Sequence, residues 1–440
     1  MVRFKEADIQ KYIWEEKEWF SELILEEIPN IDVEFDVKVE PEKLFQRITL
    51  ERLKETLNYV KGMDLIGVEV PLKKEGDSTI RADFLGVNIE DVGISVIELK
   101  KDKQTERQAF TELLAYGNHL VSLFPTMVKD DIVNVLISPM EARIVREAFL
   151  HALLVDGKRI VAFIPTFEDE TDIESLKLKL WMPDENDIKN FKSHYFSKEN
   201  FEVVKIAWRG DSDTYDFNED PNYAEKMFMN YISSYVAQVM EEKNIHGFCF
   251  TSRCFPELKM PYPNSLIIVG MNPYKISYKN NGYVGDVDTL RQYGFEHSVG
   301  LDDIIKGLKL EEEHIQYLEN LHVNWSSHLV KVGTDSLRFL FKDTNGKRVS
   351  LEYGIFTLKQ YWSSLIESGF AFNYDIFPTC GFKKLYSEVL KLDYEFVAKN
   401  GVNEYPMGDI FKELIESYKS HHFIEINLGR MFGLDLEDIM

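Results

Sequence analysis

The sequence predicts an α/β protein in which a mixed sheet flanked by helices is followed by a larger mixed α/β domain. Apolar residues recur at helical spacing in some segments and at alternating or continuous, strand-like spacing in others. Up to residue 165 these segments run helix, three strands, helix, strand, helix, strand, the order of a mixed sheet sandwiched by helices. A chain of 440 residues also exceeds one ordinary core, so we expect two or three domains.

The N-terminal part has the more regular pattern. Near-helical apolar spacing predicts helices at 6–29 and 41–61, and apolar runs predict a three-stranded meander at 65–72, 80–87 and 93–100 with a turn at 88–91. A helix at 105–124, a strand at 131–138, a helix at 141–154 and a strand at 159–165 complete it. The acidic patch 168–172 and the polar stretch 209–222 indicate a boundary. We therefore predict domains at 1–170 and 223–440, with 171–222 as linker and boundary region.

The C-terminal part alternates helices and strands less regularly. The pattern predicts a long aromatic-rich helix at 223–242, strands at 245–251 and 264–271, a helix pair at 301–321, helices at 359–367 and 407–420, and a closing strand at 422–428. Alternation at 337–341 and 349–353 around Asn345-Gly346 predicts a hairpin, because Asn-Gly is strongly favoured in tight hairpin turns.

Composition indicates a soluble globular protein. Hydrophobic residues make up 44% of the chain and are well mixed with polar ones. The N-terminal segment is charged from the third residue, so we expect no secretory signal, and no apolar run approaches membrane-spanning length. The three cysteines form no CxxC pair, which indicates neither a disulfide framework nor a zinc site. We expect a cytoplasmic protein without membrane contact.

The strongest chemical signal lies on the predicted strand 93–100 and its neighbour. Glu98 and Lys100 are two apart on a strand, so both side chains leave the same face of the sheet. An ionised pair at the end of an apolar strand costs free energy unless it is paired or bound to a metal. Asp83 lies on the preceding strand, and a hairpin through the turn at 88–91 would carry it close to Glu98.

Two neighbouring carboxylates repel each other, and a hard divalent cation such as Mg²⁺, or Mn²⁺ in its place, resolves that repulsion. We expect Asp83, Glu98 and the main-chain carbonyl of Leu99 to be the metal ligands. Lys100 beside the ion would orient a water and offset charge developing on a phosphate. The structural alternative is a strand-end salt bridge between Glu98 and Lys100, or an inactive relic of such a site.

This arrangement resembles the PD-(D/E)xK nuclease superfamily, with Asp83 as the first acid, Glu98 as the second and Lys100 as the lysine. The resemblance covers about residues 40–165 and implies a restriction-endonuclease-like sheet and magnesium-dependent endonuclease activity on DNA and on RNA. On the following helix Gln108, Glu112 and Tyr116 lie at i, i+4 and i+8. The resemblance gives Gln108 and Tyr116 supporting catalytic roles.

Many members of this superfamily add an acid from the first helix. Glu51 and Glu55 on the predicted helix 41–61 are candidates here, as is Glu69 on the first strand, and the sequence does not choose between them. Other chemistry is poorly represented: there is no glycine-rich phosphate loop and no GxSxG motif. Aromatic residues in the C-terminal part, such as Tyr231, Tyr235, Trp325, Tyr361 and Trp362, could stack on bases, but their spacing predicts core positions.

The charge balance bears on how such a nuclease meets its substrate. The formal net charge is -24, with 22 Lys and Arg against 34 Asp and Glu in residues 1–170 and 29 against 41 in the remainder. A protein that grips a phosphate backbone unaided normally carries a basic face. An acidic chain must therefore cluster its few cations locally or rely on a partner that brings the nucleic acid. We favour the partner.

The C-terminal part carries no catalytic signature, which indicates a recognition role. An acidic, aromatic-rich α/β module behind a nuclease resembles, in size, order and acidity, the nuclease-APAZ subunits of short prokaryotic Argonaute (SPARDA) defence systems. That resemblance implies a heterodimer with a short Argonaute-like protein that carries guide and target nucleic acid. It also implies self-association of the nuclease domains on activation. The alternatives are a stand-alone restriction-type endonuclease that reads its own target and a non-catalytic scaffold.

Overall fold

The computed structural model describes most of the chain up to residue 400. The described ranges are 4–25, 41–71, 81–124, 126–128, 131–196, 200–208, 223–254, 260–274, 315–341, 350–356 and 374–400, together with residues 28, 31, 309, 311 and 358. The chain divides into two compact units, the first comprising Met1–Val33 and Phe45–Phe191 and the second Glu34–Leu44 and Lys192–Met440. Both units combine helices with a sheet, which confirms the predicted α/β class.

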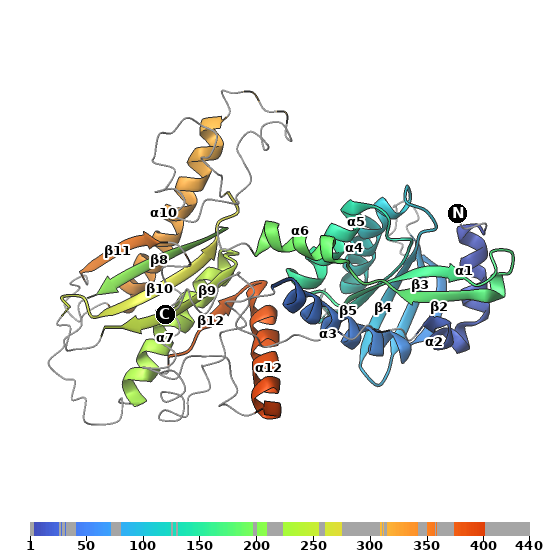
Figure 1. Ribbon diagram of the computed structural model, residues 1–440, viewed down its shortest axis with the longest axis horizontal. Coiled ribbons are helices and arrows are strands. Elements are labelled where there is room, and N and C mark those ends of the chain that lie inside the picture. Colours follow the sequence, from blue (N-terminus) through green and yellow to red (C-terminus); the bar gives the residue numbers. More distant parts are fainter. Residues whose placement is uncertain are drawn as a thin grey trace. The chain divides into compact units, whose positions relative to one another are not determined.

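The first unit is built on a seven-stranded mixed sheet with strand order β1-β7-β6-β5-β4-β3-β2 (Figure 1). Its elements are α1 (Glu6–Glu15), η1 (Lys17–Trp19), α2 (Phe20–Leu23), β1 (Ile24–Leu25), α3 (Pro41–Lys61), β2 (Asp64–Pro71), β3 (Arg81–Asn88), β4 (Gly93–Leu99), α4 (Glu106–Leu123), β5 (Ile132–Ile137), α5 (Arg143–Leu154), β6 (Ile160–Phe167), η3 (Ile173–Ser175), β7 (Leu176–Leu180) and α6 (Glu185–Tyr195). Strands β2, β3 and β4 form an antiparallel meander, β4, β5 and β6 run parallel, and β7 returns antiparallel to β6. The predicted meander and alternating order are confirmed.

The β3–β4 hairpin is closed at one end and diverges at the other. At the turn, Asn88 Oδ1 accepts hydrogen bonds from the main-chain nitrogens of Glu90 and Asp91, both at 3.0 Å. The ladder between β3 and β4 ends at the pair Phe84↔Ile97, whereas β4 stays paired with β5 as far as Leu99. Backbone groups of β4 that face β3 beyond this point are therefore available to side chains.

The second unit is built on a five-stranded antiparallel sheet with strand order β11-β8-β10-β9-β12. Its elements are β8 (Phe201–Trp208), α7 (Tyr223–Glu242), β9 (Gly247–Arg253), β10 (Asn264–Met271), α10 (Ile315–Leu340), β11 (Leu351–Phe356), β12 (Phe377–Thr379) and α12 (Phe382–Asn400). One face of the sheet, with Val204 and Ile206, packs against α7 and α10. Phe201 and Phe248, on the opposite face by strand alternation, contact Phe382 of α12.

The structure corrects the predicted domain boundaries of 1–170 and 223–440. Residues 171–222 are not a linker where they are described, because β7 and α6 belong largely to the first unit and β8 is a central strand of the second sheet. The acidic patch 168–172 is the connection between two paired strands, β6 and β7. The acidic patch therefore lies in a connection within one sheet and does not mark a domain boundary.

Two predicted elements are also wrong. Residues 337–340 form the end of the 26-residue helix α10 rather than a hairpin strand, and β11 pairs with β8 instead. The predicted helix 6–29 is broken into α1, η1, α2 and β1. The turn Asn345-Gly346 and the predicted elements at 359–367, 407–420 and 422–428 lie outside the described residues, as does most of 301–321. No helix in the described ranges combines the length and apolar character needed to cross a lipid bilayer.

Two helical glycines with different surroundings allow the packing of both units to be tested. A Cβ at Gly333 of α10 would lie 2.2 Å from Ile206 Cδ1 and 2.8 Å from Ile268 Cδ1, whereas at Gly117 of α4 the nearest atom is Ile132 Cδ1 at 3.6 Å. We predict that Gly333→Ala destabilises the protein by about 1–3 kcal/mol through overpacking. Gly117→Ala should stabilise it by about 0.5–1 kcal/mol, because alanine favours the helix. Calorimetric melting of both variants tests these predictions. A Gly333→Ala variant more stable than wild type would contradict the tight packing described around Gly333.

Candidate active site

Asp83, Glu98 and Lys100 lie on one face of the first sheet. Side chains alternate along a strand, so Glu98 and Lys100 share the face of Val96, and Asp83 shares that of Leu85. Leu85 and Val96 are cross-strand partners, which places the three charged side chains on the same face. The cluster sits at the carboxyl end of β4, the end of the strand at which open α/β sheets usually carry their sites.

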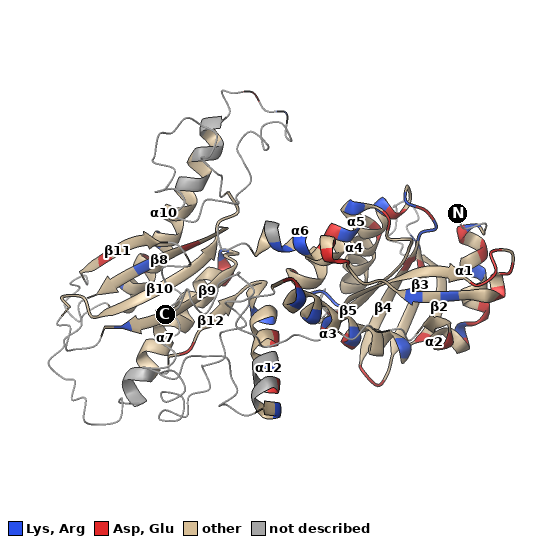
Figure 2. Cartoon of the chain, in the orientation of Figure 1, with Lys and Arg blue, Asp and Glu red and all other residues tan. Residues whose placement is uncertain are grey.

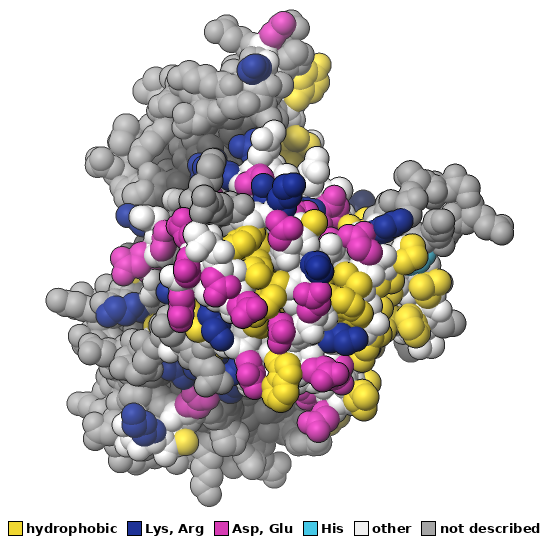
Figure 3. Space-filling model, turned by 90° about the vertical axis from the view of Figure 1, so that its right-hand side faces the viewer, with side chains coloured by type: hydrophobic (Ala, Val, Ile, Leu, Met, Phe, Trp, Pro, Cys, Tyr) yellow, Lys and Arg dark blue, Asp and Glu magenta, His cyan; other side chains and the backbone are white. Residues whose placement is uncertain are grey.

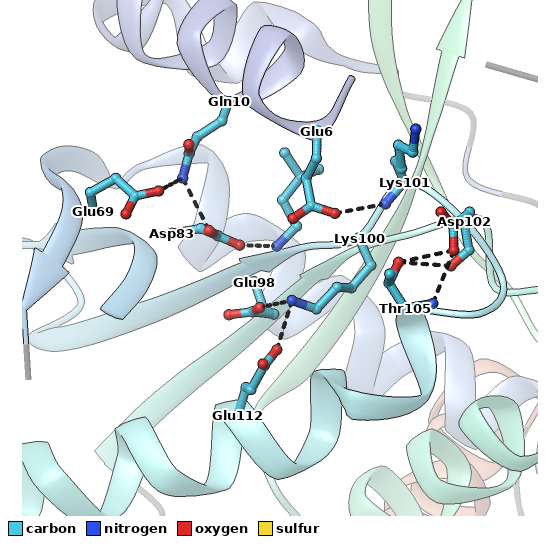
Figure 4. A network of polar contacts seen from close by, with 11 residues as sticks. Glu6, Gln10, Glu69, Asp83, Glu98, Lys100, Lys101, Asp102, Thr105 and Glu112 are labelled. Atoms are coloured by element: carbon cyan, nitrogen blue, oxygen red, sulfur yellow. Dashed lines mark hydrogen bonds and ion pairs between the residues drawn. The ribbon is translucent and has the colours of Figure 1, made fainter. Parts of the chain in front are cut away.

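The Asp83 carboxylate binds the backbone of β4 beyond the point where the β3–β4 ladder ends. Its Oδ2 accepts a hydrogen bond of 2.7 Å from the main-chain nitrogen of Leu99, and its Oδ1 accepts one of 3.0 Å from Gln10 Nε2 (Figure 4). Gln10, on α1, also donates to Glu69 Oε1 at 2.9 Å. Asp83 is therefore held from two sides, by the strand that carries Glu98 and by the N-terminal helix.

Lys100 is held between two carboxylates. Its Nζ donates to Glu98 Oε1 and lies 2.7 Å from Glu112 Oε2 on α4 (Figure 4). Glu98 is only 2% exposed, and its second oxygen, Oε2, is buried without a well-aligned hydrogen bond in the described part of the chain, although the Glu112 carboxyl and the Tyr116 hydroxyl lie close to this carboxyl. A buried carboxylate oxygen without a donor is costly, so this atom marks a position where a cation or a water would be stabilised.

The helix after β4 supplies some of the expected residues and not others. Tyr116 is buried, and its pKa is raised by burial and by the nearby carboxylates of Glu98, Glu112 and Asp83. Gln108 is exposed, and no hydrogen bond joins its side chain to the cluster among the residues that the structure describes. Eight residues of an α-helix rotate well beyond two full turns, so the side chains of Gln108 and Tyr116 point in different directions. When Tyr116 is buried, Gln108 therefore faces solvent.

Of the three upstream acids that the sequence left open, Glu69 is linked to the cluster. It shares Gln10 with Asp83, and it adopts φ 50°, a left-handed conformation that favours glycine. Glu51 pairs instead with Arg47 and Lys54 on α3. Glu55, on the same helix, is exposed.

Sequence reasoning missed two residues of α1, Glu6 and Gln10. Glu6 Oε2 accepts a hydrogen bond of 3.3 Å from the main-chain nitrogen of Lys101, and its charge contributes to raising the pKa of Asp83. Both lie more than seventy residues from Asp83 in the chain, and only their helical spacing of i and i+4 offered a signal that they share a face. Glu6 of α1 therefore lies near the cluster, whereas Glu51 of α3 is paired with Arg47 and Lys54.

The cluster carries more negative charge than Lys100 balances. Burial raises the pKa of Asp83 to about 6, with help from Glu6 and Glu69, and the hydrogen bond from Leu99 opposes this. Burial, with the adjacent Glu112 and Asp83 carboxyls, raises the pKa of Glu98 to about 9. Burial disfavours the Lys100 ammonium, but the hydrogen bonds to Glu112 and Glu98 prevail and raise its pKa. Raised carboxyl pKa values beside a charged lysine indicate a place for an additional positive charge.

The donor set fits a hard divalent cation that keeps part of its water shell. No group of three or more His, Cys, Asp or Glu side chains arranged to hold a metal is found within the described ranges. Magnesium, however, is commonly bound through one or two carboxylates with several waters, which Asp83 and the unpartnered oxygen of Glu98 would satisfy. A zinc-type site of four protein ligands does not fit these residues.

Backbone geometry aims the carbonyl of Leu99 toward Asp83. The Lys100 main-chain nitrogen donates to the Ile137 carbonyl of β5 at 2.8 Å, so this N–H points away from β3. In a trans peptide the carbonyl points opposite to the N–H, and no described peptide bond is cis. The Leu99 carbonyl therefore points toward the β3 side, where the Asp83 carboxylate lies.

The surface around the first unit is mixed in charge. Figure 2 shows acidic and basic residues distributed over its helices and strands rather than segregated. The face drawn in Figure 3 interleaves Lys and Arg with Asp, Glu and hydrophobic side chains and presents no continuous basic patch. A duplex backbone would find no single-sign surface on this face.

The raised pKa of Glu98 gives a stability prediction for the metal-free protein. Because its folded pKa of about 9 lies above the value near 4.5 of a free glutamate, the stability that protonated Glu98 contributes is present in acid and is lost as pH rises through that interval. We predict that Glu98→Gln, measured in chelator, stabilises β3 and β4 by on the order of 1–3 kcal/mol near pH 8 and less near pH 5. Hydrogen exchange of these strands, compared with wild type at each pH, is the measurement.

The exposed Glu90 in the β3–β4 turn provides the matched control. Glu90→Gln makes the same chemical change without altering a buried carboxyl, so it should leave the protection of β3 and β4 unchanged at both pH values. Equal effects of the two substitutions at both pH values would show that burial does not raise the pKa of Glu98.

Comparison with known proteins gives no relative from which a function could be transferred. No protein-family model, curated protein or solved structure matches this chain.

Proposed function

We propose that the first unit is a metal-dependent nuclease that hydrolyses phosphodiester bonds of DNA or RNA, with Asp83, Glu98 and Lys100 at its centre. The observation that carries this proposal is the convergence of the buried Glu98 carboxylate, the half-buried Asp83 carboxylate and the Lys100 ammonium at the carboxyl end of β4, with Glu98 Oε2 unpartnered among the described residues. The same three positions carry the resemblance to the PD-(D/E)xK superfamily.

Each residue has a role that follows from its contacts. Asp83 and Glu98, with the Leu99 carbonyl, would hold Mg²⁺ or Mn²⁺, which when bound polarises the scissile phosphate and lowers the pKa of a bound water. Lys100, fixed between Glu98 and Glu112, presents a charged amine that offsets negative charge developing on the phosphate. Gln10 positions Asp83 and does not itself need to touch the substrate.

The structural alternative predicts a strand-end salt bridge, and a Lys100–Glu98 ion pair is present. That pair alone accounts for neither the second carboxylate at Lys100 nor the buried, partnerless Oε2 of Glu98 in the described part of the chain. A purely structural pair is stabilised by satisfying each buried oxygen, because an unsatisfied one lowers stability. The surplus of carboxylates favours a binding site over a structural bridge.

Cleavage assays separate the two interpretations. We predict that Lys100→Ala and Asp83→Asn each lower Mg²⁺-dependent cleavage by about 100-fold or more, because each removes a charged group that acts on the reacting phosphate. Lys101→Ala is the matched control, since only the main-chain nitrogen of Lys101 contacts Glu6. Single-stranded and double-stranded DNA and RNA should be assayed in parallel, with chelator as the metal-free reference.

The control variant should keep wild-type activity. Absence of Mg²⁺-dependent cleavage by the wild type on every substrate, both alone and with its partner, would leave the non-catalytic scaffold as the remaining interpretation. Loss of cleavage in Lys101→Ala to the same degree as in Lys100→Ala would remove the special role of Lys100.

For the second unit we propose recognition through a short Argonaute-like partner that carries guide and target nucleic acid. Support comes from the formal net charge of -24, since a basic partner would supply the positive charge that binding to a phosphate backbone requires. We predict that the product of a neighbouring reading frame co-purifies with this chain as a heterodimer. Target recognition should then stimulate cleavage, and self-association should accompany it.

Co-expression followed by size-exclusion chromatography and mass spectrometry makes the test. A stable complex with an Argonaute-like protein supports the proposal. A chain that purifies alone and cleaves defined sites without help would instead establish the stand-alone endonuclease.

A further inference from the structure

A pocket of about 250 Å³ lies between α7 and α10 of the second unit, away from the residues discussed so far. Tyr235, Val239 and Lys243 line it from the α7 side, at successive helical turns. Its other wall is α10, with His328, Lys331, Val332, Asp335, Ser336 and Phe339. This volume is just below the roughly 300–1,000 Å³ of typical ligand pockets, so it suits a small ligand.

The pocket has an aromatic end and a basic end, because α7 and α10 run antiparallel along it. Tyr235 stacks on Phe339, with ring centroids 5.5 Å apart and an interplanar angle of 14°. Lys243, about 12 Å further along the α7 side, instead acts on His328, which precedes Phe339 by three helical turns. The stacked rings therefore form a wall at one end, and the basic groups gather at the other. Tyr231, one turn before Tyr235, is exposed, contrary to its predicted core position.

Three basic groups meet at this end, and the protein does not neutralise them. Burial and the charges of Lys243 and Lys331 lower the pKa of His328, so both lysines act on one imidazole. Among the described residues no carboxylate lies within ion-pair distance of either lysine. Asp335, four residues after Lys331, has the spacing of a helical ion pair, but its carboxylate lies 3.8 Å from Arg338.

Helix electrostatics account for one of these cations. Lys243 directly follows α7, and its main-chain nitrogen donates to the Val239 carbonyl at 3.3 Å, so the negative end of the helix dipole stabilises its charge. His328 and Lys331 lie in the interior of the 26-residue α10, where the dipole offers no such stabilisation. Three neighbouring basic groups repel one another, and an anion placed between them relieves that repulsion.

We propose that this pocket binds a phosphate group, held between Lys243, His328 and Lys331. The group is either inorganic phosphate or the end of a small phosphomonoester, which present the same charged oxygens. Ammonium and imidazolium groups donate strong, charge-assisted hydrogen bonds to such oxygens. The proposal does not depend on the nuclease chemistry of the first unit.

Binding is measured on the full chain through the imidazole resonances of histidine-labelled protein, with His328 assigned by means of His328→Gln. Chelator keeps phosphate from binding through a metal elsewhere on the chain. The other titratable groups in the pocket walls are Tyr235, Lys243, Lys331 and Asp335. Inorganic phosphate should move the His328 titration to higher pH, because an adjacent anion favours the imidazolium. An unchanged titration with millimolar phosphate and with millimolar ribose 5-phosphate would overturn the proposal.

Substitutions test the charge of the pocket. Lys243→Ala/Lys331→Ala should weaken phosphate binding about tenfold or more, because hydrogen bonds to a charged group are lost. Asp335→Asn should strengthen it about twofold or more, because a negative charge leaves the wall while the side-chain shape is kept. Lys391→Ala, at an exposed lysine of α12 outside the pocket wall, is the matched control and should bind as wild type does. Equal affinity of wild type and the double lysine variant would contradict the proposal.

Inorganic phosphate and ribose 5-phosphate, titrated separately, distinguish the two sources. Equal affinities identify the phosphate group alone as the ligand, and tighter binding of ribose 5-phosphate identifies a phosphomonoester. A response to a short oligothymidylate alone would overturn the proposal and assign the basic end to a nucleic-acid surface. None of these results bears on whether Lys100→Ala abolishes cleavage.

Discussion

The burial of Glu98 at the carboxyl end of β4 constrains everything around it. An ionised carboxylate 2% exposed within an otherwise apolar strand is unfavourable unless neighbouring groups compensate for it. The strand supplies Lys100 two residues on, α4 supplies Glu112 to hold that lysine, and the divergence of β3 from β4 leaves Asp83 to bond the backbone of Leu99. These contacts fix the crossover helix and the meander relative to each other. The local fold and the candidate active site therefore depend on the same few side chains.

The local part of this arrangement could be predicted from the sequence. Alternation along 93–100 placed Glu98 and Lys100 on one face, and the turn at 88–91 brought Asp83 back beside them. Two kinds of feature could not be predicted: contacts between segments far apart in the chain, and elements whose pattern was read from only a few residues. Gln10 reaches Asp83 across seventy-three positions, which no spacing rule reports. The five residues 337–341 fit a period of two as well as a helix, and the length of α10 decided for the helix. Gln108 shows that i and i+8 do not share one narrow face.

The two units arrange their charged side chains in opposite ways. The first gathers carboxylates around one lysine, an arrangement suited to a cation. The second leaves Lys243 and Lys331 without carboxylate partners in the described ranges, an arrangement suited to an anion. A net charge of -24 conceals both. Composition therefore limits how strongly the whole chain is drawn to a polyanion, while local pairing decides where contact is stabilised.

The pairing of β1 with β7 has a practical consequence for isolating the first unit. β7 joins the chain segment after residue 170 to β6 on one side and to Ile24–Leu25 on the other. A fragment that stops at residue 170 would lack β7, so β6 would keep β5 on one side but lose its pairing on the other, and β1 would lose its partner strand. Its exposed backbone edge would be a template for intermolecular strand addition, so precipitation of such a fragment would say nothing about the competence of the intact unit. Dissection of this protein should keep the chain through Phe191.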